Sequence, residues 1–357
     1  MPLVPEHINS LQPYQAGKST EELRREYGLE KIIKLASNEN PLGVSPKALK
    51  AMKNNLKSLN RYPSPDSYEL RQILARIYEV KMNNVFTGHG SESIISTIIR
   101  TFLHDEDTVL SSEGTFITFR IQAQSRGIKV IEVPLNNYRY NLAAIAERIT
   151  DTTKIIYLAN PNNPTGNIFS DDEFKHFMGK VPKQTLVLLD EAYFEFAIHD
   201  PEYPDSMKYR FDNVISLRTF SKAYGLAGVR IGYGFAHENL INNLMKIKLP
   251  FEPSGTAQAA AVAALTDTAF LDKTIKLARD GRKFFYNFFD NTGIRYLESH
   301  ANFVTIILDS EEQVNYIFQS LLKRGVIVRP LKSFGLPNCI RITTGLPEEN
   351  RIFSENL

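Results

Sequence analysis

The sequence has few of the features that mark secreted, membrane or nucleic-acid-binding proteins. Its 357 residues contain a single cysteine, Cys339, which excludes a disulfide framework and a cysteine-based zinc site and fits a reducing compartment. The 42 basic and 40 acidic side chains leave a formal net charge of +2. That balance argues against nucleic-acid and membrane-surface partners, because both need a concentrated basic face. No apolar run approaches the roughly 20 residues of a membrane helix, and the amino terminus lacks the basic start and apolar centre of a signal peptide.

These absences predict a cytoplasmic globular protein, and most proteins of that class are enzymes. No metal ligands are assigned. The length allows one large domain with a smaller companion.

The order of the predicted elements indicates an α/β fold. Between about residues 45 and 235, apolar runs of strand length alternate with helical patterns. The strands include 154–159, 185–189, 214–217 and 231–235, and the helices include 67–80 and 91–103. The run 186–189 has no polar alternation, as expected for a strand covered on both faces. This alternation predicts a mostly parallel sheet flanked by helices.

The carboxyl-terminal part has a different pattern. Residues 255–290 predict one long helix with an aromatic stripe in the core, formed by Phe284, Phe285, Phe288 and Phe289. Short strands around one further helix then predict a small α+β domain. We divide the chain into an amino-terminal segment (1–44) that packs on the small domain or on a partner subunit, a large domain (45–265) and a small domain (266–357). Few residues remain after Arg351, which leaves little room for a full closing helix.

Polar clusters follow four of the predicted strands. They begin at Gly88, Asn160, Asp190 and Arg218 and read GHGSE, NPNNPTG, DEAY and RTFSK. Each alone has an ordinary structural explanation, such as a tight turn, a rigid proline turn, a helix cap or a surface lysine. Right-handed crossovers, however, bring all four to one edge of the sheet, where ligands bind in open α/β folds. Their common position favours a shared binding site.

The clusters together supply the groups that pyridoxal 5′-phosphate requires. That cofactor needs a lysine amine for its aldehyde and an acid beside its pyridine nitrogen, and Lys222 and Asp190 are the candidates. An ionised, buried Asp190 would keep the ring nitrogen protonated by Coulomb attraction. Lys222, as a free amine, would move a proton between the substrate Cα and the cofactor C4′. The large domain would therefore bind the cofactor.

Other side chains fit the remaining groups of the cofactor. Asn163 and Tyr193 can hydrogen-bond the phenolic oxygen, and Phe116 can stack on the pyridine face. The loop 88–92 at a helix start would cradle the phosphate, together with hydroxyl groups and the guanidinium of Arg230. We assign Lys222, Asp190 and Tyr193 as catalytic. The cofactor-binding set on this chain is Gly90, Ser91, Glu92, Phe116, Asn163, Asp190, Tyr193, Thr219, Ser221, Lys222 and Arg230.

These motifs resemble those of the fold-type-I, pyridoxal-phosphate-dependent aminotransferases, an α/β fold with a large domain and a small one. A narrower resemblance, to the histidinol-phosphate aminotransferase family, covers nearly the whole chain. Its segments are PYQAGK at 13–18, LASNENPLG at 35–43, RYP at 61–63, SYELR at 67–71, GVIVRP at 325–330 and IRIT at 340–343.

The resemblance implies a homodimer in which Tyr62 reaches the partner's cofactor phosphate. It also implies that Arg341 binds the carboxylate of glutamate, that Arg329 and Tyr14 lie near the substrate phosphate, and that Asn38 belongs to the substrate set. The implied reaction exchanges an amino group between L-histidinol phosphate and 2-oxoglutarate in histidine biosynthesis. Guanidinium groups bind carboxylate and phosphate alike, so one pocket can serve both substrates.

Alternatives and departures stay open at this point. The same cofactor would serve an aromatic amino-acid aminotransferase or a lyase that resembles threonine-phosphate decarboxylase. A non-catalytic module that only binds a metabolite would need no Schiff-base lysine, so Lys222 speaks against it. Relative to the family pattern, Gly114 replaces a common proline, Phe116 replaces a commoner tyrosine, and Ser93 replaces a second acid. His89 is expected to face solvent.

Overall fold

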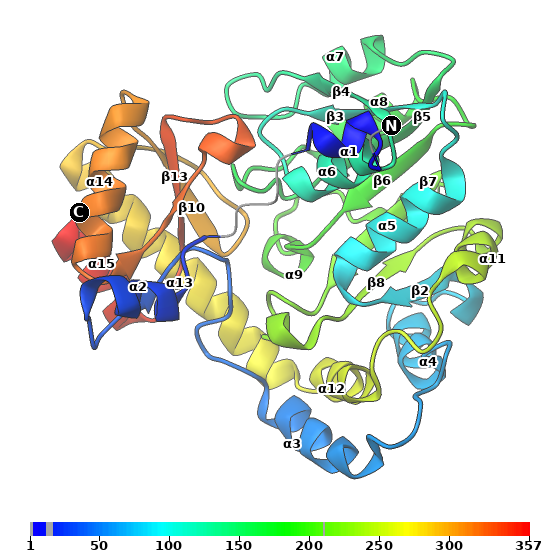
Figure 1. Ribbon diagram of the computed structural model, residues 1–357, viewed down its shortest axis with the longest axis horizontal. Coiled ribbons are helices and arrows are strands. Elements are labelled where there is room, and N and C mark those ends of the chain that lie inside the picture. The colour runs from blue at the N-terminus through cyan, green and yellow to red at the C-terminus, as the bar shows by residue number, and fades with distance from the viewer. Residues whose placement is uncertain (1–2, 12–16, 210) are drawn as a thin grey trace.

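The computed structural model describes residues 3–11, 17–209 and 211–357, and its largest element is a seven-stranded sheet (Figure 1). The strand order is β2-β8-β7-β6-β5-β3-β4. Strand β8 is antiparallel to both of its neighbours, and the remaining pairs are parallel, which confirms the mostly parallel sheet. The strands are β2 (Val85–Gly88), β3 (Thr108–Ser112), β4 (Lys129–Val133), β5 (Thr153–Ala159), β6 (Leu186–Asp190), β7 (Val214–Thr219) and β8 (Gly232–Phe235).

Helices cover both faces of this sheet. Helices α5, α6 and α11 pack on one face and α7 and α8 on the other, so alternate side chains of β5 enter two separate cores. Helices α3, α4 and α12 pack together at one end of the sheet. The helices are α3 (Pro46–Asn55), α4 (Tyr68–Ile77), α5 (Gly90–Phe102), α6 (Ile117–Ser125), α7 (Leu142–Glu147), α8 (Asp171–Met178), α9 (Phe194–Ala197), α10 (Ser206–Tyr209), α11 (Glu238–Ile247) and α12 (Gly255–Leu265), with short 3-10 turns at η1 (Leu56–Ser58), η2 (Met82–Asn84) and η3 (Ala227–Val229).

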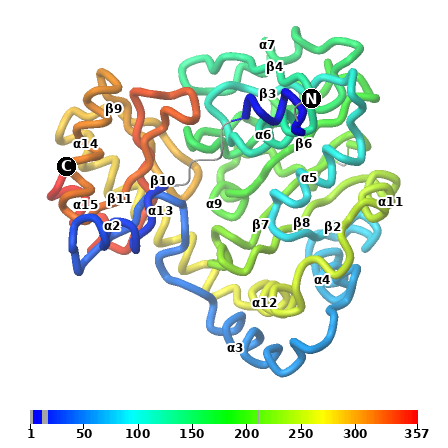
Figure 2. The backbone as a smooth tube through the Cα atoms, viewed as in Figure 1, coloured from blue at the N-terminus to red at the C-terminus, as the bar shows by residue number. Residues whose placement is uncertain are grey.

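A smaller antiparallel sheet, β12-β13-β10-β9, lies beside the long helix α13 (Figure 2). The strand β1 near the amino terminus pairs in parallel with β11, so the early chain joins the carboxyl-terminal part. The short helix α1 instead lies against α6 of the large sheet. The elements are α1 (Glu6–Asn9), α2 (Thr20–Tyr27), β1 (Ile33–Lys34), α13 (Thr268–Thr292), β9 (Arg295–Leu297), β10 (Phe303–Ile307), α14 (Glu311–Lys323), β11 (Val326–Ile327), β12 (Arg329–Pro330), η4 (Lys332–Phe334), β13 (Cys339–Thr343) and α15 (Pro347–Asn356).

Two expectations about the carboxyl-terminal part were wrong. The single helix over 255–290 is two helices, because Asp267 leaves the helical conformation and its Oδ2 accepts a 2.5 Å hydrogen bond from Ser45 Oγ. A closing helix does form as α15, and it buries Phe353 against the ring of Phe285. The aromatic stripe is only partly in the core: Phe285 and Phe289 are fully buried, Phe288 is partly buried, and Phe284 is exposed. The division of the chain at residues 44 and 265 stays a prediction.

None of the helices in the described part of the chain has the length and apolar character of a membrane span.

An internal charge cluster lies behind the carboxyl end of β6. Arg218 on β7 is fully buried, with its Nε 2.9 Å from Glu191 Oε2 and its Nη2 3.3 Å from Asp205 Oδ1. Glu195 is only 4% exposed, and neither of its carboxyl oxygens has a hydrogen-bond partner in the described chain. Desolvation therefore raises the pKa of Glu195 from 4.5 to about 7.

Replacing Glu195 tests this burial. The folded protein binds the Glu195 proton more tightly than the unfolded chain, so this group's contribution to stability falls as the pH rises from 4.5 to about 7. Glu195→Gln should remove a cost of about 3 kcal/mol at pH 8 and raise the melting temperature there. At pH 5 the variant should gain far less. Equal rises in melting temperature at pH 8 and pH 5 would contradict a raised pKa of Glu195. So would the same pH-dependent rise in the control Glu147→Gln, at an exposed position.

Candidate active site

A cavity opens at the carboxyl edge of the larger sheet. Its empty space is about 820 Å³, open solvent at its mouth included. The parallel strands β5, β6 and β7 end at this edge and the antiparallel β8 begins there, so distant segments meet. The predicted residues that line it are Ser91, Glu92, Phe116, Asn163, Asp190, Tyr193, Thr219, Ser221, Lys222 and Arg230.

Lys222 follows β7 and brings its amine into this cavity. The Nζ atom donates to the carbonyl oxygen of Ser37 at 3.2 Å and lies 5.8 Å from the ring centroid of Tyr193. Burial lowers the pKa of Lys222 to about 8, and the positive charges of Arg341 and Arg230 act in the same direction. A substantial fraction of the amine is therefore neutral slightly above neutral pH, as a nucleophile or a general base requires.

Asp190, the last residue of β6, supplies a buried carboxylate in the same cavity. Its Oδ2 accepts a hydrogen bond from the Tyr157 hydroxyl at 2.8 Å, and its Oδ1 accepts one from the Ala192 N–H at 3.1 Å. Burial raises the pKa of Asp190 to about 6, and these hydrogen bonds oppose that rise. The carboxyl group is thus mostly ionised at neutral pH.

The start of α5 forms an anion cradle with two hydroxyl groups and a guanidinium group. Thr219 Oγ1 lies 3.0 Å from Ser221 Oγ, and the guanidinium of Arg230 lies 3.5 Å from a carboxylate oxygen of Glu92. Helix N–H groups and a guanidinium together favour a phosphate.

The cradle leaves no room for larger residues. A Cβ added to Gly90, which has φ +77°, would come within 2.7 Å of Arg230 Nη2. A Cβ added to Gly232 would come within 2.7 Å of the Ser91 amide nitrogen. The two glycines therefore let the phosphate-type loop, β8 and Arg230 approach each other closely.

Two buried arginines lie on the small sheet, and one of them, Arg341, contacts Asn163, which lines the cavity. Arg341 on β13 donates to Asn163 Oδ1 at 2.5 Å and to the Ala36 carbonyl at 2.6 Å. Arg329 on β12 is its direct cross-strand neighbour, and the two residues are 5% and 9% exposed. Directly opposed residues of two paired strands project from the same face of a sheet, so both arginine side chains lie on one face of the small sheet.

Asn38 contacts Tyr193, a member of the predicted cofactor-binding set. Its Nδ2 donates to the Tyr193 hydroxyl at 2.7 Å, and its own side-chain oxygen accepts from Thr343.

Some predicted residues lie elsewhere. Tyr62 does not line the cavity: it is 80% exposed, and its ring stacks on Phe251 with the centroids 4.2 Å apart. Tyr14 lies outside the described residues. His89 is exposed, as expected. Gly114 has φ +59°, which proline cannot adopt, so the family's proline would require a different backbone here.

The sequence interpretation missed Tyr157. The sequence pattern places this residue only within an apolar run of strand length, whereas in the structure its hydroxyl donates to Asp190. The available signal was a tyrosine in an otherwise aliphatic buried strand, since a buried phenol needs a polar partner.

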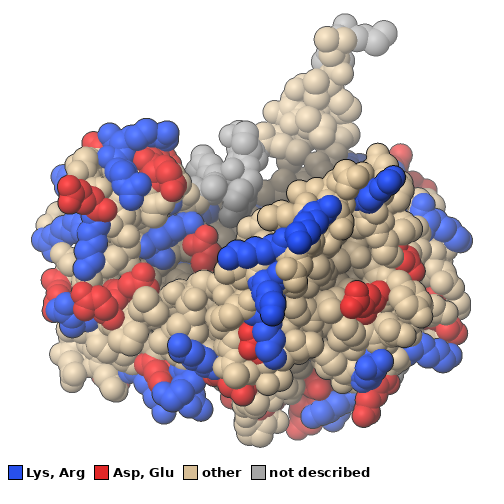
Figure 3. Space-filling view, turned by 90° about the horizontal axis from the view of Figure 1, so that it is seen from below, with Lys and Arg blue, Asp and Glu red and all other residues tan. Residues whose placement is uncertain are grey.

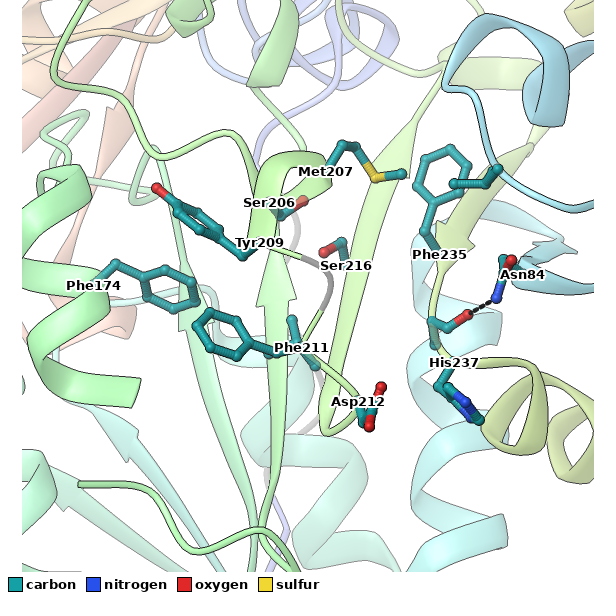
Figure 4. A pocket seen from close by; sticks show the side chains of 13 residues that line it. Asn84, Phe174, Ser206, Met207, Tyr209, Phe211, Asp212, Ser216, Phe235 and His237 are labelled. Carbon is teal, nitrogen blue, oxygen red and sulfur yellow. Dashed lines mark hydrogen bonds between the residues drawn. The ribbon is translucent and has the colours of Figure 1, made fainter. Parts of the chain in front are cut away.

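A second cavity lies at the opposite end of β7, and it holds none of the predicted residues. It measures about 680 Å³ with its open solvent, and its lining includes the aromatic side chains Phe174, Tyr209 and Phe211 (Figure 4). Across the described ranges, no three His, Cys, Asp or Glu side chains gather as metal ligands. The candidate active site is therefore the cavity that contains the Lys222 amine and the Asp190 carboxylate.

Comparisons with known proteins agree with this geometry. Residues 30–355 match the family model of class I and II aminotransferases. The chain is 44% identical over 351 residues to histidinol-phosphate aminotransferase 2 of Hydrogenovibrio crunogenus, with 97% of this chain and 93% of that protein covered. It is 41% identical over 353 residues to histidinol-phosphate aminotransferase 1 of Idiomarina loihiensis, with 98% and 95% covered.

Among solved structures, the chain is similar to histidinol-phosphate aminotransferase from Sinorhizobium meliloti in complex with pyridoxal-5′-phosphate. The TM-score is 0.90 at 29% identity, with 99% of this chain and 96% of that chain covered. The expected fold-type-I architecture is thereby confirmed. The chain belongs to the class I and II aminotransferases and, within them, to the histidinol-phosphate aminotransferase family.

Proposed function

We propose that the cavity at the carboxyl edge binds pyridoxal 5′-phosphate and that the protein transfers an amino group between L-histidinol phosphate and 2-oxoglutarate, forming imidazole-acetol phosphate and L-glutamate in histidine biosynthesis. The observation that carries the proposal is one cavity lined by the Lys222 amine, the Asp190 carboxylate and an anion cradle. The names of the full-length relatives support the substrate, and the Sinorhizobium structure supports the cofactor.

The residues fit the cofactor group by group. The cradle at Gly90, Ser91, Thr219, Ser221 and Arg230 would hold the phosphate, and the two glycine contacts described above keep side chains out of it. Lys222 would bind the aldehyde carbon, and Asp190 would face the ring nitrogen. Glu92 would act by holding the guanidinium of Arg230. When bound, the cofactor supplies an electron sink for negative charge at the substrate Cα.

The protein's own groups then perform the remaining tasks. Asp190, ionised at neutral pH, would favour a proton on the ring nitrogen by Coulomb attraction. Lys222, with its lowered pKa, would move a proton between the substrate Cα and the cofactor C4′. Tyr193 and Asn163 would hydrogen-bond the phenolic oxygen, and Phe116 would cover a face of the ring.

The arginine pair would recognise the anionic ends of both substrates. Arg341, next to Asn163, would bind the carboxylate of glutamate, and Arg329, directly across the strands, would bind the phosphate of histidinol phosphate. Asn38, which donates to the Tyr193 hydroxyl, would belong to the substrate-binding residues. Tyr14 is proposed as a substrate-binding residue from the sequence alone. The aromatic aminotransferase and the phosphate-bearing lyase remain the alternatives to test.

A single-turnover test distinguishes these functions. Histidinol phosphate and glutamate should each bleach the visible absorbance of the loaded protein, because both carry the anion that the arginine pair recognises. Phenylalanine should react more slowly, and no carbon dioxide should form from threonine phosphate. Faster bleaching by phenylalanine would favour an aromatic aminotransferase, whereas carbon dioxide release would favour the lyase.

Arg329→Gln sharpens the same test. Loss of a charge-assisted contact costs about 1.5–3 kcal/mol, so kcat/KM for histidinol phosphate should fall roughly 10- to 100-fold. The reaction with glutamate should change much less. The exposed Arg295→Gln, on β9 at the opposite edge of the same sheet, serves as the control. Equal losses for both substrates would remove Arg329 from phosphate recognition.

We further propose a cytoplasmic homodimer in which Tyr62 reaches the partner's cofactor phosphate. Apolar side chains gather without cover in the segments 56–68 and 247–251: Leu59 is 64% exposed, and Leu56, Tyr62, Leu249 and Phe251 are also exposed. Helix α3, which leads into the first segment, lies at the lower end of the molecule, and the view from below shows broad uncharged surface crossed by a short row of Lys and Arg (Figure 3). Exposed apolar patches of this kind mark interfaces.

Leu59→Glu tests the dimer, because it places a charge in the apolar patch. The variant should sediment at the mass of one chain and lose most of its activity, whereas the wild type sediments at the mass of two. Lys57→Glu, which changes the charge on the same turn without changing an apolar residue, is the control. A wild-type protein of single-chain mass with full activity would overturn the proposal.

A further inference from the structure

Tyr157 places a phenol hydroxyl directly behind the cavity. The residue lies on β5, next to β6, and is fully buried. Its hydroxyl donates to Asp190 Oδ2 at 2.8 Å. The Tyr157 ring stacks on the ring of Phe119 at a centroid distance of 4.7 Å and an interplanar angle of 10°. The phenol is therefore held in one orientation by packing and by one hydrogen bond.

We propose that Tyr157 is a positioning residue for the transamination: its hydroxyl keeps the Asp190 carboxylate ionised and fixed in the orientation that serves the ring nitrogen of the cofactor. This inference rests on the proposed function. No substrate or cofactor atom needs to touch Tyr157, because it acts through Asp190.

The direction of the hydrogen bond follows from the chemistry of the two groups. An ionised carboxylate offers only acceptors, so the phenol must donate. Burial and the charge of Asp190 hold the pKa of Tyr157 well above 10, so the hydroxyl keeps its proton throughout the working range. A donor to a carboxylate stabilises its charged form.

The other groups around Asp190 do not replace this donor. The Ala192 N–H bonds to the other oxygen, Oδ1. Lys222 attracts the negative charge across the cavity, whereas Glu191 on the same strand end repels it. Tyr140, which lies before α7, bonds to Thr115 and to the Ala159 N–H, and the Tyr193 hydroxyl accepts from Asn38. Without Tyr157, Oδ2 has no hydrogen-bond donor among the described residues.

Removing the hydroxyl should therefore make the carboxylate easier to protonate. In Tyr157→Phe the ring and its stacking on Phe119 remain, but Asp190 Oδ2 loses its hydrogen-bond donor. That hydrogen bond no longer opposes the rise in the Asp190 pKa that burial causes. A larger fraction of Asp190 is then neutral at pH 7, and a neutral carboxyl cannot hold the proton of the ring nitrogen by charge.

The first test uses the cofactor-free protein. Carboxyl ¹³C resonances of wild type and Tyr157→Phe are titrated, and the Asp190 signal is identified by its absence in Asp190→Asn. The Asp190 midpoint should rise by about one pH unit in Tyr157→Phe, the size expected for one hydrogen bond. Tyr233→Phe is the matched control, since Tyr233 is equally buried and its hydroxyl pairs with Tyr78 at 3.2 Å. An unchanged midpoint in Tyr157→Phe would overturn the inference.

A second substitution keeps the test decisive if Tyr157→Phe does not fold. Incorporation of 3-fluorotyrosine at position 157 keeps the hydroxyl and makes it a stronger donor, so the Asp190 midpoint should fall. A midpoint that rises or stays constant with this residue would contradict the proposed hydrogen-bond role.

The loaded enzyme gives an independent readout. In Tyr157→Phe the acid limb of the kcat profile should move to higher pH by the same interval, and raising the pH should restore much of the lost rate while KM for the amino donor stays constant. A uniform fall at every pH would indicate a merely structural role and overturn the inference. If wild type fails to bind pyridoxal phosphate, the proposed function fails, whereas the titration of the cofactor-free protein still tests the Tyr157–Asp190 pairing.

Discussion

The removal of water from two opposite charges is the constraint on which the site depends. Burial raises the pKa of Asp190 to about 6 and lowers the pKa of Lys222 to about 8. Each group alone would be costly in that environment. The hydrogen bonds to Asp190 and the charge of Lys222 favour the ionised carboxylate, whereas the positive charges of Arg341 and Arg230 make the Lys222 amine easier to deprotonate. The fold thus prepares an acid and a base in one cavity by burial and by neighbouring charge.

The sheet topology makes this arrangement possible. Parallel β5, β6 and β7 end at one edge and deliver Asn163, Asp190 and Lys222 there, and the antiparallel β8 starts at that edge with Arg230 just before it. Behind the site, the fully buried ion pair of Arg218 with Glu191 fixes the residue that follows Asp190. The small sheet adds its arginine pair from the other side. The cavity therefore combines groups from segments that are far apart in sequence.

Much of this could be predicted because local patterns determine it. Local sequence marks the ends of two strands directly. One is the uniform apolar run of β6, which ends in Asp190, and the other is the Ser221-Lys222 pair after β7. Other features depend on distant contacts that the local sequence does not carry. The helix break at Asp267 depends on Ser45, more than two hundred positions away. Helix α15 is stabilised by the packing of Phe353 against Phe285. The pairing of Arg329 with Arg341 follows from strand register, and the role of Tyr157 from the packing of two neighbouring strands.

Chemical trapping of the cofactor tests the central claim most directly. The purified protein, loaded with pyridoxal 5′-phosphate, is reduced with borohydride and digested, and the labelled peptide is identified by mass. We expect a stable label on Lys222, with a weaker yield in Asp190→Ala because the cofactor is bound less firmly. A label on another lysine, or no label on a protein that remains folded, would contradict it.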